Sequence, residues 1–220
     1  GILFDKVKGI FKAPSTNGAA FAIESGYGQS LILAGINSLL IGLMGAMPFI
    51  RINGMMKSFG DVPKEYLLPS FKFFWYFGIL AFAMAAAYPA ALMLVSKIFK
   101  SQTGYKQMLG VSGVFNIMMA PFSVLSILTL LIMPFNSDSS PDALANWLLI
   151  FAFFFACGII LGLFAAGKAA KGAAINISED GRVWFMFLST AAMLIVYFVL
   201  TKIFDAVFGS GLDSLMGSLS

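Results

Sequence analysis

The chain alternates between long apolar runs and short polar connections. Five of the runs carry no charged residue in their interiors. They are Gly28–Ile50, Phe73–Ser96, Gln107–Phe135, Ala143–Gly167 and Val183–Thr201. An α-helix rises about 1.5 Å per residue, so about 20 apolar residues cross roughly 30 Å of hydrocarbon. The pattern therefore predicts an all-α membrane protein with five transmembrane helices.

A different pattern precedes the first run. The apolar residues there recur at helical spacing, and the charged residues fall on other sides of the helix. The apolar residues are Leu3, Phe4, Val7, Ile10 and Phe11. This is typical of an interfacial amphipathic helix. Pro14 is expected to end it, and a second short helix is expected over Gly18–Ser25, capped by Ser15, Thr16 or Asn17. The predicted organisation is an N-terminal interfacial segment (1–27), a five-helix transmembrane domain (28–208) and a flexible C-terminal tail (209–220).

Composition supports a membrane protein and excludes several chemistries. The chain is 60% hydrophobic, with 24 Phe and 13 Met, and its mean hydropathy is +0.91, which is more apolar surface than a soluble domain of this length can bury. It has no His and one Cys, Cys157, so Cys/His zinc sites and histidine bases are excluded. The carboxylates are scattered, and no phosphate-binding or nucleophile motif occurs. We therefore expect a non-enzyme without metal or cofactor.

The charges of the connections predict an orientation. One side of the membrane receives nine basic residues: Lys6, Lys8, Lys12, Lys97, Lys100, Lys106, Lys168, Lys171 and Arg182. The other side receives five: Arg51, Lys57, Lys64, Lys72 and Lys202. Basic loops stay cytoplasmic, so we expect a cytoplasmic N-terminus and a C-terminus outside. The lysines expected at the membrane surface are Lys6, Lys8, Lys12, Lys100 and Lys106.

Polar residues inside the spans are the candidates for a site. Asn37 lies in the first span, and Asn116 and Ser123 lie in the third. An amide in hydrocarbon is costly unless paired. One interpretation is therefore a hydrogen bond between helices, and the alternative is a polar spot in a cavity that holds a lipid headgroup or a small ligand. Pro121 frees a carbonyl one turn earlier, near Ile117, which predicts a kink there.

Two spans carry stripes of small residues suited to close helix packing. The stripe in the fourth span consists of Gly158, Gly162 and Ala166, and the second span contains Ala83 and Ala87. Such stripes join helices within one chain or between two copies, which leaves a homo-oligomer open. We favour packing within the chain, because five helices must find one another before a dimer forms.

The order of these parts resembles the Yip1 domain family of five-span membrane proteins. The matching pieces are Phe11-Lys12-x-Pro14-x-Thr16 before the first span, the basic turn Lys97–Lys106, the third-span sequence Leu109–Val114, and Ala120-Pro121. The Asp-Leu-Tyr-Gly-Pro motif typical of eukaryotic members is missing, which favours a bacterial-type member and a bacterial cell membrane.

The resemblance implies a non-enzymatic adaptor or scaffold that acts through membrane protein partners, accessory to a transporter or to trafficking machinery. The expected partners are the lipid bilayer and other membrane proteins, and no nucleic acid. The alternative hypothesis is binding or transport of a lipid or small solute through an intramembrane cavity. A membrane-embedded enzyme acting on lipid is the third, and it lacks an acid/base pair or an activated nucleophile.

Overall fold

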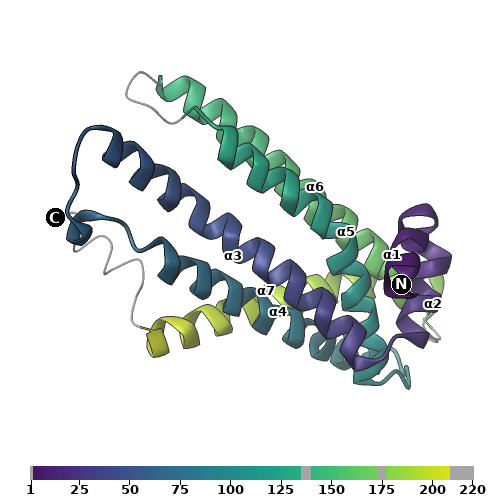
Figure 1. The fold of residues 1–220 in the computed structure, drawn as a ribbon. Helices are drawn as coiled ribbons and strands as arrows, with labels where there is room; N and C mark the ends of the chain where they lie inside the picture. The colour runs from purple at the N-terminus through teal and green to yellow at the C-terminus, as the bar shows by residue number, and fades with distance from the viewer. Residues whose placement is uncertain (1, 135–139, 173–176, 209–220) are drawn as a thin grey trace.

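The computed structural model describes residues 2–134, 140–172 and 177–208 (Figure 1). The helices are α1 (Ile2–Lys12), α2 (Pro14–Glu24), α3 (Tyr27–Ser58), the 3-10 turn η1 (Lys64–Tyr66), α4 (Ser70–Ile98), α5 (Tyr105–Ile132), α6 (Pro141–Gly172) and α7 (Glu179–Phe208). No strand occurs in these ranges. The predicted C-terminal tail, 209–220, lies outside the described residues.

Five helices in the described ranges, α3 to α7, are long and apolar enough to cross a membrane. This confirms the predicted fold class and makes the chain a multi-pass membrane protein. The helices are longer than their apolar cores: α3 has 32 residues and continues through Pro48 to Ser58, which gives it a length of about 48 Å. A bilayer core is about 30 Å thick, so the polar end of α3 projects beyond the hydrocarbon.

The spanning helices form a row in the order α6, α5, α3, α4, α7 (Figure 1). Neighbours in this row pack against one another, and α4 also reaches α5. Helix α5 is the most buried, because α3, α4 and α6 surround it. Its residues Val111, Val114 and Met119 belong to the main hydrophobic core. A smaller apolar cluster joins α3 to α5, through Met44, Met47, Ile127 and Leu130.

The second N-terminal helix begins earlier than the sequence suggested. The expected start was Gly18, but α2 begins at Pro14, with Ala13 as the N-cap. Proline suits the first helical turn because it has no N–H to leave unpaired and its φ is preset. Asn17 lies inside α2 instead of capping it, and its side-chain amide donates to the carbonyl of Gly9 at 2.7 Å. That bond holds α1 against α2.

Helix α2 packs against the ends of α5 and α6. Gly18 fits between Val114 of α5 and Ala169 of α6, and Gly110 of α5 faces the backbone of Ala22. The buried face of α2 therefore packs against α5 and α6. An interfacial role for α1 is not confirmed and stays a prediction.

Polar groups fasten the opposite end of the bundle. Asn53 of α3 bonds Leu68 twice, accepting from its N–H at 2.8 Å and donating to its carbonyl at 2.9 Å. Arg51 donates to the carbonyl of Met133 at 2.6 Å, just beyond the C-terminus of α5, where a cation also complements the helix dipole. Both residues lie in the part of α3 that the apolar pattern did not include.

Candidate functional site

The three polar candidates of the spans meet at one point between α3 and α5. The Asn37 Nδ2 atom donates to Asn116 Oδ1 at 3.0 Å, and the Ser123 hydroxyl donates to Asn37 Oδ1 at 3.4 Å. Asn37 and Asn116 are each 4% exposed, and Ser123 is 1% exposed. The sequence placed the two amides on different spans, and the fold makes them partners. We refer to these three residues as the amide cluster.

One group of the amide cluster is left without a partner. Asn116 Nδ2 is buried and meets no acceptor among the described residues. Pro121 follows in the same helix and has no N–H, so the Ile117 carbonyl lacks its usual helical donor. α5 continues through Pro121 to Ile132, and the predicted kink there stays a prediction. The cluster contains no titratable group, so its chemistry is limited to hydrogen bonding.

The glycines of the fourth span lie at the α5–α6 contact. A Cβ atom at Gly158 would come within 2.8 Å of the Phe122 side chain, and one at Gly162 within 2.7 Å of the Phe115 ring. Ala166 is fully buried on the same face of α6. The stripe is therefore occupied by α5 of the same chain.

The alanines of the second span are half-buried. Ala83 and Ala87 lie in α4, and two residues between them offer their carbonyls to α5: Ala86 accepts from the Tyr105 hydroxyl at 2.9 Å, and Ala85 from the Ser112 hydroxyl at 3.4 Å. Small side chains on α4 let these hydroxyls reach its backbone.

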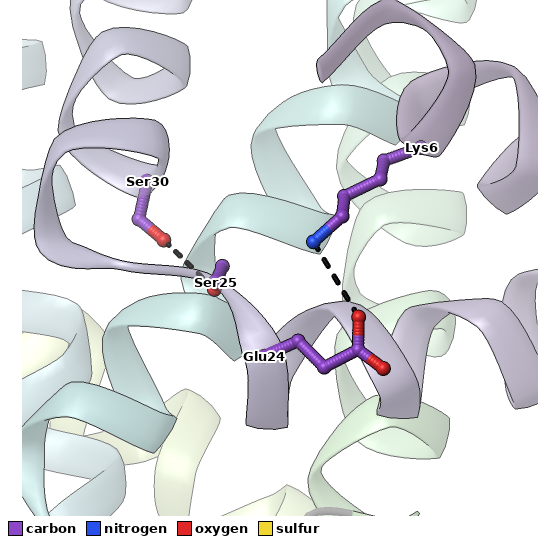
Figure 2. A network of polar contacts seen from close by, with 4 residues as sticks. All are labelled: Lys6, Glu24, Ser25 and Ser30. Atoms are coloured by element: carbon purple, nitrogen blue, oxygen red, sulfur yellow. Dashed lines mark hydrogen bonds and ion pairs between the residues drawn. The ribbon is translucent and has the colours of Figure 1, made fainter. Parts of the chain in front are cut away.

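The lysines expected at the membrane surface differ in their surroundings. Lys6 of α1 forms an ion pair with Glu24 at the end of α2, at 3.4 Å, and Ser25 and Ser30 are hydrogen-bonded beside it (Figure 2). The other four are exposed and have no ion pair with a described residue; they are Lys8, Lys12, Lys100 and Lys106. Only Lys6 thus has its charge compensated by a described neighbour.

A groove between α3 and α4 was not anticipated from the sequence. Its volume is about 380 Å³, and its lining includes Gly35, Gly78, Phe74, Trp75 and Phe82. The Ser38 hydroxyl also lines it but donates to the Ala34 carbonyl at 2.6 Å. The only signal in the sequence was the pair of glycines among large apolar residues on consecutive spans.

No group of three or more His, Cys, Asp or Glu residues in the described ranges could hold a metal ion. Comparison of the chain with protein-family models, curated proteins and solved structures finds no match.

Proposed function

We propose that the chain is a non-enzymatic membrane adaptor of the Yip1 type, in a bacterial cell membrane with its N-terminus in the cytoplasm. In this proposal, α6 and α7 bind an integral membrane protein laterally. The order of a short N-terminal helical segment and five spans supports the family. The amide cluster supports a role without chemistry, because it contains only amides and a hydroxyl. The excess of basic residues at the α1–α2 end supports the orientation.

The uncovered faces of α6 and α7 carry this proposal. In the most apolar window of each span, 50% of the residues of α5 are buried, against 17% in α6 and 11% in α7. α7 packs mainly on α4. Its exposed residues include Ile195 and Phe198, each 64% exposed. Each of these outer helices packs on one side only against the described residues, so that most of its apolar surface is left for a helix of another protein.

Photo-crosslinking in native membranes tests the adaptor. Ile195 and Phe198 are three positions apart and lie on one face of α7. A photoreactive residue at either position is expected to give the same discrete adduct with another membrane protein. The matched control is Leu128 of α5, which is also exposed and apolar, and it is expected to give lipid adducts alone. Lipid adducts at all three positions, with no protein adduct, would contradict the proposal.

The groove between α3 and α4 favours a second function, binding of a single lipid hydrocarbon chain. Its lining is almost entirely apolar, and its one hydroxyl is already bonded to backbone, so it suits a hydrocarbon chain better than a polar ligand. The volume is in the range of ligand sites, which is about 300–1,000 Å³.

Filling the groove tests this second function. A Cβ at Gly35 meets no atom within 4 Å, so Gly35→Phe is expected to occupy the groove without disturbing α3. Lipid retained by the purified protein in native mass spectrometry should then fall to background, with an unchanged melting temperature. Gly54→Phe, at an equally open glycine of α3 away from the groove, should retain lipid like the parent protein. Equal retention in the parent and both variants would exclude the groove.

A further inference from the structure

Helix α1 has a second apolar face that the bundle does not use. Its inner face consists of Leu3, Val7 and Ile10, which pack against the main core, and Ile10 is completely buried. Phe4 is nevertheless 69% exposed, and Phe11 is 44% exposed. A helix that only fastened itself to the bundle would need no aromatic residues on its outer side.

The exposed aromatic residues share their side of α1 with a lysine. Phe4, Lys8 and Phe11 follow the i, i+4, i+7 spacing of one helix face, and Lys12 follows Lys8 at the next turn. Lys8 and Lys12 are exposed, whereas Lys6 points to Glu24 of α2 (Figure 2). The acidic residue facing outward from α1 is Asp5, which is also exposed. The outer face thus combines two aromatic rings with two lysines that have no ion pair among the described residues.

The position of α1 along the bundle suits a membrane surface. α2, which carries α1, meets α5 at Gly110 and Gly113, close to the start of this 28-residue helix. Such a helix is about 42 Å long, so with α5 centred on a hydrocarbon core of about 30 Å, these glycines lie near the hydrocarbon boundary. α1 is then at the level of the lipid headgroups.

Charge distinguishes this end of the bundle from the other. Among the described residues it carries nine basic and four acidic residues, a net charge of +5. The opposite end carries five basic and four acidic residues, a net charge of +1. Anionic headgroups attract juxtamembrane basic residues, and the attraction falls off within a Debye length.

We propose that the outer face of α1 binds an anionic phospholipid surface, with Phe4 and Phe11 inserted below the phosphates and Lys8 and Lys12 bound to them. The bound ligand is the headgroup layer of the leaflet at this end of the bundle. This surface is separate from the α6–α7 faces and from the α3–α4 groove. The proposal is therefore independent of both proposed functions.

The test uses the full chain in nanodiscs, with Cys157→Ala and a polarity-sensitive fluorophore on a cysteine at Phe4 or, as a control, at Phe59. Phe59 follows α3 at the opposite end and is also 69% exposed. Nanodiscs of phosphatidylcholine alone are compared with equal parts of phosphatidylcholine and phosphatidylglycerol, and brominated acyl chains report insertion. Quenching at position 4 is expected to rise with the anionic lipid, whereas quenching at position 59 is expected to stay constant.

The lysines are tested by charge removal. K8Q/K12Q is expected to lower the inserted-to-free ratio of α1 in anionic nanodiscs about 30-fold, and K57Q/K64Q at the opposite end is expected to leave it unchanged. Both pairs are exposed, so the melting temperature should stay constant and verify the fold. The proposal would be overturned if quenching at position 4 did not change with the anionic lipid. It would also be overturned if both pairs of lysine substitutions changed this quenching equally.

Discussion

Replacing Gly110 with valine is expected to detach α2 from the bundle. A Cβ atom at Gly110 would lie 2.7 Å from both the Cα and the carbonyl oxygen of Ala22, and 2.8 Å from the Ser25 hydroxyl. Two of these neighbours are backbone atoms, so no change of rotamer relieves the clash. Overpacking of this kind costs about 1–3 kcal/mol. The measurements are the melting temperature in detergent and the rate of proteolysis after α2.

Gly35→Val is the matched control for this substitution. Gly35 is also a helical glycine inside a span, but a Cβ there meets no atom within 4 Å. It is expected to leave both the melting temperature and the proteolysis rate close to those of the parent. If Gly110→Val behaved like Gly35→Val, the close contact of α2 with α5 would be wrong.

Replacing Asn116 with leucine is the second substitution with a large expected effect. It leaves Asn37 Nδ2 without its acceptor at a site that is 4% exposed. An unsatisfied buried polar group costs about 1–3 kcal/mol, and leucine keeps the branched outline of asparagine without its polar atoms. We expect a corresponding loss of unfolding free energy, measured by reversible unfolding in mixed micelles.

The double variant shows whether the amide cluster is a contact or a ligand site. In N37L/N116L both amides are replaced by apolar side chains, so stability should recover relative to either single variant. Measured couplings between such groups in membranes average about 0.6 kcal/mol and reach about 1.7 kcal/mol. A polar ligand held by Asn116 would instead be lost equally in N116L and in the double variant. Additive losses of stability would contradict the paired arrangement.

The spans could be predicted from the sequence because an apolar run of about 20 residues without charges is typical of a transmembrane helix. Their ends could not, because hydropathy reports where hydrocarbon ends and not where helical hydrogen bonding ends. Arg51 and Asn53 illustrate the difference: both are polar, both continue α3, and both bind the chain beyond it. A loop was the natural expectation for them.

The packing of α2 could not be predicted, because periodicity detects large apolar side chains. α2 instead approaches its neighbours through small residues: Ala22 faces Gly110 of α5, Ala19 faces Gly172 of α6, and Gly18 lies between Val114 and Ala169. Small residues give a weak hydropathy signal even where backbones touch. The amide cluster was predictable in part: the cost of an unpaired amide predicts that Asn37 and Asn116 have partners, but choosing those partners requires knowing that α3 neighbours α5.

The docking of α2 also has a consequence for biosynthesis. Ala19 contacts Gly172 at the end of α6, so α2, which is synthesised before α3, waits until the end of α6 has been made before this part of its binding site exists. Contacts so distant in sequence form slowly, and an N-terminal segment emerges long before they can form. During that interval α2 is open to proteases and chaperones, and its protection from cleavage would mark the moment at which the end of α6 has packed against it.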